Sequence, residues 1–418
     1  MEAISRPPTG TGSTRLSTVP FSRDTSDLLT AVVERLDYEQ DTQHRYILVA
    51  HLFDDTQRMI DALAGHIHLD AIFGIPYSSN REGIIEHWGR LYGDRVFITP
   101  SIGEMESAIV KQIAKSLALC RQNGQKLIIQ EVGGFVVPLL HKYFRDELDL
   151  LKGVVELTKQ GVWRAEAEDL GLPVLHCAGS ELKRLEAKRC GETIARCLDG
   201  LARDLGISLA GRHATVLGGG WIGSGVAGAL RRLDMIPSIM EIDALKLAEA
   251  RLDGFAASRH GEDLERSALV VGATGRRSIT PEVLARLPDG AIVASASSRQ
   301  HEIDVGFLKG HPSSRIGDVL EAFHLVDDGA DAARTLLLVN DGYPANFIPG
   351  SGSVPDEIVE TVLAELIVLM HALSETEFAP GIHPITREQE ALCAEIWLDL
   401  RDRAHRGGAP RPALAATV

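Results

Sequence analysis

A glycine-rich turn between a short apolar run and an amphipathic segment is the feature that most constrains the fold of this chain. From His213 the sequence reads His-Ala-Thr-Val-Leu-Gly-Gly-Gly-Trp-Ile-Gly-Ser-Gly. This predicts a strand over 214–217, a tight turn and a helix. Gly218 permits the turn, Gly220 lets backbone amides approach a ligand, and Gly223 allows the helix to pack closely on the strand. The pattern predicts a dinucleotide site, with the pyrophosphate at the helix N-terminus.

An acidic residue after the next predicted strand favours one dinucleotide over another. Glu241 ends the strand predicted at 238–241, 21 residues after Gly220. A carboxylate at this position accepts hydrogen bonds from a ribose 2′-hydroxyl and repels a 2′-phosphate. We therefore predict that the cofactor is NAD.

Short apolar runs alternate with longer helical patterns along the whole chain, which is typical of parallel α/β sheets. The first series of predicted strands comprises 46–50, 69–73, 96–99, 127–130, 154–156 and 173–176, with helices at 56–64 and 104–123. The second series comprises 214–217, 238–241, 269–272, 291–295 and 336–339, with long helices before it (181–205) and after it (355–373). The predicted fold is α/β, with two doubly wound Rossmann-like domains, parallel sheets and a ligand cleft between them.

The domain boundaries follow from these patterns. Residues 1–25, rich in Ser, Thr, Pro and Gly, predict a disordered tail. A substrate-binding domain is expected at 26–195, completed by 347–375, and an NAD-binding Rossmann domain at 196–346. Residues 376–418 are expected to form a C-terminal extension.

Composition excludes several classes of function. With 418 residues, 44% hydrophobic and 24% charged, the chain resembles a globular protein of two domains. Its net charge of −15 argues against a nucleic-acid surface, and no apolar run is long enough to span a membrane. The five cysteines show no metal-binding spacing, so no metal site is predicted. With no signal peptide recognisable, we expect a cytoplasmic protein.

A wider set of motifs resembles the S-adenosylhomocysteine hydrolases, in register from about residue 45 to residue 400. The cofactor half shares the glycine turn, Glu241-Ile-Asp, Gly272-Ala-Thr-Gly and Glu302-Ile-Asp-Val. Upstream, Glu131-Val-Gly-Gly lies where the family has Asp-Asp-Gly-Gly, and residues 153–162 resemble its Ser-Glu-Glu-Thr-Thr-Thr-Gly-Val segment. His51, Asn346 and Gly381-Ile-His also have counterparts.

The resemblance implies a specific chemistry and a set of site residues. In that family a tightly held NAD transiently oxidises a ribose hydroxyl, which acidifies a neighbouring proton; elimination, water addition and reduction follow. By position, Lys183 is the expected proton-relay group, Glu156 the residue that orients substrate hydroxyls, and Glu131 a further catalytic candidate. His51, Asp55 and Ser353 are expected at the substrate. The expected cofactor contacts are Gly218, Gly220, Trp221, Ile222, Gly223, Glu241, Thr158, Thr274, Gly275 and Asn346.

Several acid–base positions of the family are replaced. The Asp and Asn that follow the family's lysine become Ala187 and Lys188, and the second acids of its two carboxylate pairs become Val132 and Leu157. The histidine before the Glu-Ile-Asp-Val run becomes Ser298. We therefore expect a different substrate or reaction from ordinary S-adenosylhomocysteine hydrolysis.

Three functions remain open from the sequence. The first is an S-adenosylhomocysteine hydrolase-like enzyme that oxidises a sugar hydroxyl of a nucleoside or similar polyhydroxylated metabolite. The second is a simple NAD-dependent dehydrogenase that releases NADH in each turnover. The third is a catalytically inactive relative that binds NAD or a nucleoside and regulates a partner. A homo-oligomer, dimer or tetramer, is expected in each case.

Overall fold

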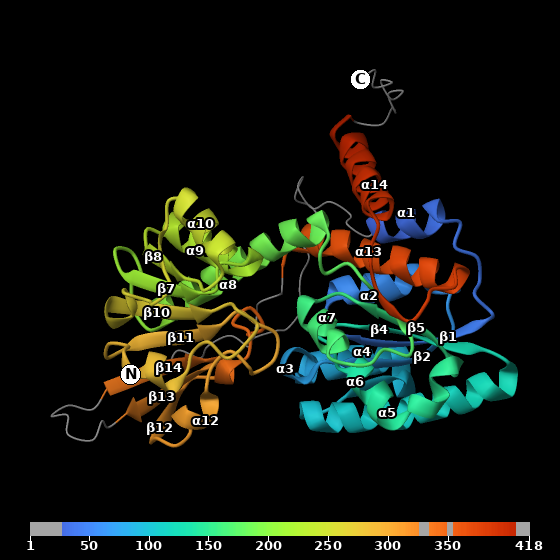
Figure 1. Ribbon diagram of the computed structural model, residues 1–418, viewed down its shortest axis with the longest axis horizontal. Coiled ribbons are helices and arrows are strands. Elements are labelled where there is room, and N and C mark those ends of the chain that lie inside the picture. Colours follow the sequence, from blue (N-terminus) through green and yellow to red (C-terminus); the bar gives the residue numbers. More distant parts are fainter. Residues whose placement is uncertain (1–26, 326–333, 349–353, 407–418) are drawn as a thin grey trace, which may run out of the picture.

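Two α/β lobes, each built around one sheet, form the described part of the chain (Figure 1). The structure is a computed structural model that describes residues 27–325, 334–348 and 354–406. The predicted tail, 1–25, and the candidate substrate residue Ser353 lie outside these ranges.

The first lobe contains a seven-stranded, entirely parallel sheet in the order β15-β6-β5-β4-β1-β2-β3. Its strands are β1 (His44–Ala50), β2 (Leu69–Gly74), β3 (Val96–Ile98), β4 (Lys126–Glu131), β5 (Leu151–Glu156), β6 (Pro173–His176) and β15 (Gly381–Pro384). Its helices are α1 (Asp27–Arg35), α2 (Asp54–Ala62), α3 (Pro76–Ser79), α4 (Glu82–Tyr92), α5 (Ile102–Asn123), α6 (Val136–Tyr143) and α7 (Lys159–Glu166). All six predicted strands are confirmed.

The buried centre of this sheet explains why its strands were visible in the sequence. Ile47, Leu48 and Val49 of β1, and Ile128 and Ile129 of β4, are fully buried. Strands covered by helices on both faces read as continuous apolar runs. Strand β15 was not predicted, because its four residues are only partly buried at the edge of the sheet.

The second lobe contains an eight-stranded sheet in the order β12-β13-β14-β11-β10-β7-β8-β9. Its strands are β7 (His213–Leu217), β8 (Ile236–Met240), β9 (Ala256–Ser258), β10 (Ser267–Gly272), β11 (Ala291–Ser295), β12 (Ser313–Ile316), β13 (Leu320–Leu325) and β14 (Arg334–Val339). Its helices are α9 (Trp221–Arg232), α10 (Ala244–Leu252), α11 (Pro281–Ala285) and α12 (Val305–Leu308). The order of the strands from β9 to β14 is the order found in Rossmann-type dinucleotide-binding sheets.

The expectation of parallel sheets is wrong for one edge of this lobe. Strand β13 pairs antiparallel with both β12 and β14. The turn between β12 and β13 contains Gly317 at φ +65°, a conformation that favours glycine. Strand β12 reads Ser-Ser-Arg-Ile and is exposed throughout, so it carries no apolar pattern that would predict a strand.

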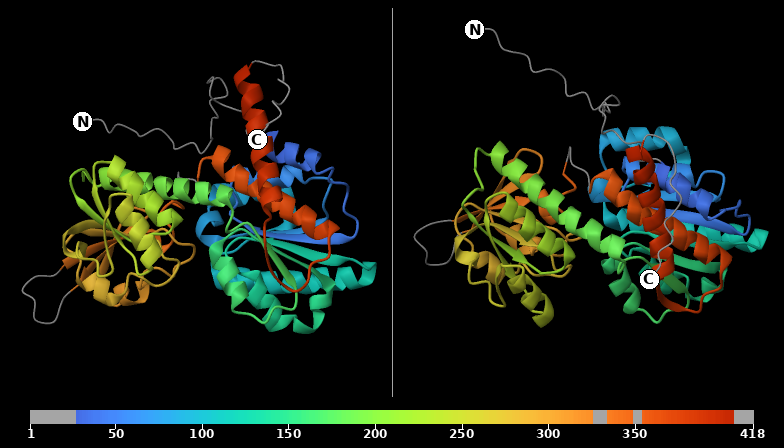
Figure 2. Two further views of the ribbon diagram at one scale, coloured as in Figure 1. Left: turned by 45° about the horizontal axis from the view of Figure 1, so that its top comes forward. Right: turned by 90° about the horizontal axis from the view of Figure 1, so that it is seen from above.

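A long helix connects the lobes. Helix α8 (Glu181–Asp204) runs from the first lobe into the second, and Figure 2 shows it as one continuous green rod. A Cβ on Gly191 would lie 2.4 Å from the Ile222 carbonyl oxygen, and one on Gly225 2.4 Å from that of Lys188. The two glycines thus let α8 and α9 touch backbone to backbone.

The chain then returns to the first lobe. Helix α13 (Asp356–Glu375) buries most of its length against α1, α2, α8 and the first sheet, and α14 (Arg387–Arg406) packs on α13 and α1. Arg58 of α2 pairs with Asp356 and Glu360 at the start of α13, at 2.8 and 2.5 Å. These ion pairs tie the returning chain to the lobe in which it began.

Candidate functional site

The candidate site residues follow the strands on either side of each sheet's switch point, where the order of successive strands along the sheet reverses. In the second sheet this switch point lies between β7 and β10, which precede Gly218 and Thr274. In the first sheet it lies between β1 and β4, which lead to His51 and Glu131. Ligands of open α/β sheets bind at the carboxyl ends of strands beside a switch point.

The glycine turn has the geometry that a dinucleotide requires. Gly218 has φ +102°, and a Cβ on Gly223 would lie 1.9 Å from the Gly218 carbonyl oxygen. Gly220 precedes α9, has no side chain that caps the helix, and has no atom within 4 Å of where its Cβ would be. The amides of Trp221 and Ile222 thus begin a helix beside open space, which fits a pyrophosphate.

Glu241 binds the glycine turn through its carboxylate. Its Oε2 accepts a hydrogen bond from the Gly219 amide at 2.7 Å, and its Oε1 accepts one from the Asp243 amide at 2.8 Å. The carboxylate is 7% exposed and held in one orientation. These contacts place an acceptor beside the dinucleotide turn, as the NAD prediction requires.

A buried carboxylate shapes the loop after β10. Glu302, fully buried, accepts hydrogen bonds from the amides of Thr274 (3.1 Å) and Gly275 (2.9 Å). The Thr274 hydroxyl lies 2.7 Å from the same carboxylate. Glu302 thereby fixes the loop that carries two expected cofactor contacts. The Glu302-Ile-Asp-Val motif is visible in the sequence, but this role of Glu302 is not.

Glu131 and Glu156 are buried carboxylates that bind loop amides in the first lobe, as Glu302 does in the second. Glu131 accepts from the amides of Val136 and Val137, at 2.8 and 3.4 Å. Glu156 accepts from the amides of Gly133, Gly134 and Thr158, at 3.1, 2.9 and 2.6 Å, and from the Thr158 hydroxyl at 2.7 Å. Burial and the neighbouring Glu131 raise the pKa of Glu156 to about 8.

In the structure, the carboxylates of Glu131 and Glu156 bind backbone amides of the loops that follow their strands. Both carboxylates are buried and directed at their own loops, and a Cβ on Gly161 would collide with Glu156. The residues that follow them, Val132 and Leu157, are 7% and 8% exposed. The structure thus shows Glu131 and Glu156 organising the loops at the carboxyl ends of β4 and β5.

Lys183 lies in a buried cluster at the start of α8. Its Nζ is 2.7 Å from Oε2 of Glu186, one helical turn further on, and their side chains are 16% and 7% exposed. Burial lowers the pKa of Lys183, but the charge of Glu186 and its hydrogen bond outweigh burial and raise it above the usual value. The thiols of Cys177 and Cys190 lie close enough to act on the same amine.

His51 faces this cluster from β1. Its Nδ1 lies 2.6 Å from the Ser78 hydroxyl, and its ring stacks on Phe347 with centroids 4.3 Å apart. Burial and the charge of Lys183 lower the pKa of His51 to about 3, so the ring is neutral at physiological pH.

Asn346 meets the cluster through Cys190, whereas the carboxylate of Asp55 is bound within its own helix. Asn346, 2% exposed, places Nδ2 3.8 Å from the Cys190 sulfur of α8. Asp55 is turned onto its own helix, where it accepts from the amide and hydroxyl of Thr56. The structure thus brings Lys183, His51 and Asn346 together and leaves Asp55 outside the group.

The loops of the two lobes touch over this region. The Gln160 amide of α7 donates to the Gly275 carbonyl, and the Arg276 guanidinium lies 5.3 Å from the centroid of the Trp163 ring. Thr158, expected at the cofactor, caps the N-terminus of α7 by accepting from the Gly161 amide. The N-terminal turn of α7, which Thr158 caps, therefore contacts the loop that carries Gly275.

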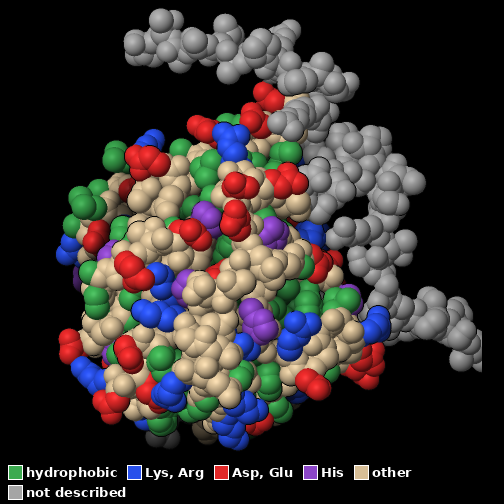
Figure 3. All heavy atoms as spheres, turned by 90° about the vertical axis from the view of Figure 1, so that its right-hand side faces the viewer, with side chains coloured by type: hydrophobic (Ala, Val, Ile, Leu, Met, Phe, Trp, Pro, Cys, Tyr) green, Lys and Arg blue, Asp and Glu red, His purple; other side chains and the backbone are tan. Residues whose placement is uncertain are grey.

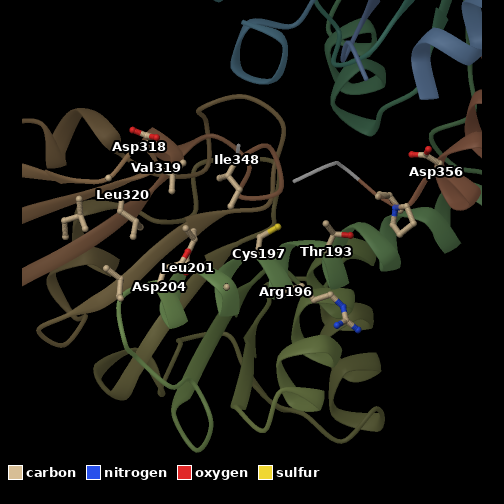
Figure 4. Close-up of a pocket in the computed structure, with 16 residues that line it drawn as sticks. Thr193, Arg196, Cys197, Leu201, Asp204, Asp318, Val319, Leu320, Ile348 and Asp356 are labelled. Carbon is tan, nitrogen blue, oxygen red and sulfur yellow. The ribbon is translucent and has the colours of Figure 1, made fainter. Parts of the chain in front are cut away.

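A large pocket lies elsewhere and does not contain the candidate residues. It encloses about 1000 Å³ between α8, the β12–β13 turn and the start of α13 (Figure 4). Its lining includes Cys197, Leu201, Val319 and Ile348, with the charged groups dispersed around it. The hydrogen bonds and strand ends described above, and not this pocket, therefore define the candidate site.

Other features of the described residues complete the picture. None of the helices in these ranges is both long and apolar enough to cross a membrane. Within the same ranges, no cluster of three or more His, Cys, Asp or Glu side chains is arranged to hold a metal ion. On the face in Figure 3, acidic and basic side chains are interspersed.

Comparison with known proteins agrees with this geometry. Residues 190–346 match the NAD-binding domain of S-adenosyl-L-homocysteine hydrolase. The chain is 28% identical over 396 residues to an S-inosyl-L-homocysteine hydrolase of Methanopyrus kandleri, covering 91% of this chain and 89% of that one. It is 28% identical over 272 residues to the S-inosyl-L-homocysteine hydrolase of Methanosarcina mazei (64% and 65% of the chains). It is 31% identical over 281 residues to the adenosylhomocysteinase of Pyrococcus abyssi (65% of each chain).

The two sheets, the glycine turn and Glu241 define an NAD-dependent enzyme with Rossmann-like lobes. Its residues 190–346 resemble the cofactor domain of the S-adenosylhomocysteine hydrolases, and the chain is similar to enzymes of that family.

Proposed function

We propose that this enzyme oxidises a sugar hydroxyl of a nucleoside-type substrate, with Lys183 as the group that accepts the hydroxyl proton. The observation that carries the proposal is the buried Lys183–Glu186 pair, 2.7 Å apart, between His51 and the Cys190–Asn346 contact. Bound NAD supplies the acceptor for the hydride that leaves the same carbon.

Glu186 supplies a carboxylate that the sequence comparison found missing. The family's acid after its lysine corresponds to Ala187, but Glu186 lies one position earlier and is directed at Lys183. A carboxylate that holds the amine stabilises its charged form after proton transfer and fixes its position. Lys183 must be neutral to accept a proton, so its raised pKa implies that turnover increases with pH.

The other residues have positioning and binding roles in this proposal. His51, neutral and hydrogen-bonded to Ser78, offers a polar ring nitrogen to the substrate without adding a charge beside Lys183. Glu156 and Glu131 shape the loop that covers the sugar instead of contacting it. Val132 and Leu157 make this part of the site apolar where the family has acids.

The substrate class follows from the relatives. Two of them are named S-inosyl-L-homocysteine hydrolases and one an adenosylhomocysteinase, so we propose a nucleoside thioether of one of these two kinds. A simple dehydrogenase that releases NADH in each turnover is the second candidate.

Denaturing the purified protein and assaying the released nucleotide separates the two candidates. We expect one NAD per chain, and reduction of this bound NAD on addition of inosine or adenosine, followed by the absorbance of the reduced nicotinamide. Protein that carries no nucleotide would contradict a resident cofactor and favour the dehydrogenase. Bound NAD that no nucleoside reduces would favour an inactive regulatory relative.

A further inference from the structure

A buried arginine at the junction of the lobes has no role in the chemistry described above. Arg299 follows β11 in the loop before Glu302 and is 7% exposed. Its backbone has φ +67°, in the left-handed region that residues other than glycine seldom adopt. Such conformations cluster at ligand sites, where the surrounding structure holds them.

The guanidinium of Arg299 is stacked but not paired. It lies 3.7 Å from the centroid of the Phe135 ring in the first lobe, so one of its faces is covered. Its Nε and Nη2 are buried and have no hydrogen-bond partner among the residues that the structure describes. A stacked guanidinium keeps its N–H groups free in the plane of the group, where they can bind an anion at two points.

The neighbours of Arg299 do not satisfy it. Glu106, Tyr77 and Glu131 are near enough to act on its charge, but the buried Nε and Nη2 have no hydrogen bond to any of them, and the oxygens of Glu131 accept from the amides of Val136 and Val137. Burial, with the like charge of Arg164, lowers the pKa of Arg299 to about 10. Burial lowers the pKa of His301, and the charges of Arg299, Arg164 and Arg277 lower it further, so three cations lie close to His301.

The same arginine borders the candidate substrate site. Its backbone amide is hydrogen-bonded to Tyr77, whose ring lies 5.6 Å from that of His51 and 5.0 Å from that of Tyr343. Phe135 directly follows Gly133 and Gly134, whose amides bind Glu156. An anion held by Arg299 would therefore belong to a molecule that also reaches His51.

We propose that Arg299 binds an anionic group, a carboxylate or a phosphate, on the substrate. The inference rests on the proposed nucleoside function and adds a specificity-determining contact to it. A buried guanidinium with two unused N–H groups discriminates strongly against a ligand that lacks the anion, because the charge then stays buried and unpaired.

Calorimetric binding to the NAD-loaded protein tests this. The probes are inosine, inosine 5′-monophosphate, S-inosylhomocysteine and the decarboxylated analogue of S-inosylhomocysteine. We expect one anionic probe to bind at least about tenfold more tightly than its uncharged or decarboxylated counterpart. A gain with S-inosylhomocysteine identifies a carboxylate, and a gain with the monophosphate identifies a phosphate.

Three variants test whether Arg299 is the source of this gain in affinity. Arg299→Gln should abolish the difference in affinity between the charged and uncharged probes, and Arg299→Lys should restore only part of it, because a lysine lacks the planar fork. Arg277→Gln removes the same charge from an exposed neighbour that pairs with Asp304, and it should keep the gain. Equal affinity for charged and uncharged probes, or a gain that survives in Arg299→Gln, overturns the proposal.

The proposed function can fail separately. If neither inosine nor adenosine binds, the nucleoside function is contradicted, and inorganic phosphate alone then tests the anion site. Phosphate should raise the melting temperature of the parent and of Arg277→Gln but not of Arg299→Gln. The same rise in Arg299→Gln, or none in the parent, would rule the anion site out.

Discussion

Glu186 holds Lys183 from one turn further along α8, with 2.7 Å between the carboxylate oxygen and the amine nitrogen. The pair lies at the lobe boundary, and a Lys-x-x-Glu spacing places both side chains on one helix face.

Removing the amine should stop the chemistry without removing the cofactor. In Lys183→Ala we expect nucleoside-dependent reduction of bound NAD to slow by about 10²–10⁴-fold, the usual contribution of a general base. NAD content should stay at the parental level, because Lys183 lies eight residues, or about 12 Å of helix, from Gly191 beside the turn. Parental rates of reduction in Lys183→Ala would exclude it as the base.

Removing the carboxylate of Glu186 should shift the pH dependence of the reduction rate. Glu186 raises the pKa of Lys183 by its charge and its hydrogen bond. In Glu186→Gln that pKa falls, so the neutral amine forms at lower pH and the alkaline rise in rate shifts to lower pH. The reduction rate measured as a function of pH in both proteins checks this. If the pH–rate profile does not move, the ionisation of Lys183 does not produce the alkaline rise in rate.

Two glycines of the turn should separate folding from cofactor binding. Gly220→Ala fits the apoprotein, since φ is −70° and no atom lies within 4 Å of the new Cβ. Its methyl group would occupy the space for the pyrophosphate, so we expect a parental apoprotein melting temperature and loss of NAD. Gly223→Ala would place its Cβ 1.9 Å from the Gly218 carbonyl oxygen and should destabilise the apoprotein as well. Thermal unfolding with nucleotide analysis distinguishes the two outcomes, and tight NAD binding by Gly220→Ala would contradict the placement.

Glu241 should control the choice between the two dinucleotides. In Glu241→Gln the charge that repels a 2′-phosphate is gone, and the Gly219 amide keeps an acceptor. We expect NAD to bind about tenfold more weakly and the discrimination against NADP to shrink. Titration of the apoprotein with each nucleotide gives both values. Unchanged affinity for both would place the ribose elsewhere.

Glu365 should make the enzyme less stable as pH rises. Burial raises the pKa of this α13 residue to about 8, and its carboxyl meets Ser180 at 2.9 Å. Cys177, Cys393, Glu390 and Lys183 are the other ionisable groups acting on Glu365 or within reach of it. Because the folded pKa is above the unfolded value of 4.5, the stabilisation is complete below pH 4.5 and is lost as pH rises through about 8.

The matched variant for this effect is Glu365→Gln. It keeps an acceptor for Ser180 but cannot ionise, so its urea stability should change less than that of the parent between pH 5 and 8. The free energy of unfolding of the parent should therefore fall relative to that of the variant as pH rises. If the difference between the two proteins is constant across this range, Glu365 is not the titrating group.

Much of this arrangement was accessible from the sequence, and the reasons are physical. The central strands were visible because they are covered on both faces, and Gly218, Gly223 and Glu241 because a close turn tolerates few other residues. Strand β12 was missed because its side chains are exposed, and the antiparallel edge was missed with it.

Two features of the candidate site were not accessible from the sequence. Glu131 and Glu156 stand at strand ends, but position along the chain does not show whether a carboxylate faces a ligand or its own loop amides. Glu186 does not occupy the position of the family's acid, because a helix can present an acid from the neighbouring position. Its spacing of three from Lys183 was the available signal.

The backbone contact between α8 and α9 has a consequence for any motion of the lobes. Because Gly191 and Gly225 remove the side chains between the two helices, α8 is rigidly joined to the cofactor lobe, while its first turn is embedded in the other lobe. A rotation that separates the lobes would then pivot near that first turn. Points near a pivot move least, so Lys183 would keep its position while the rest of the site opens and closes around it.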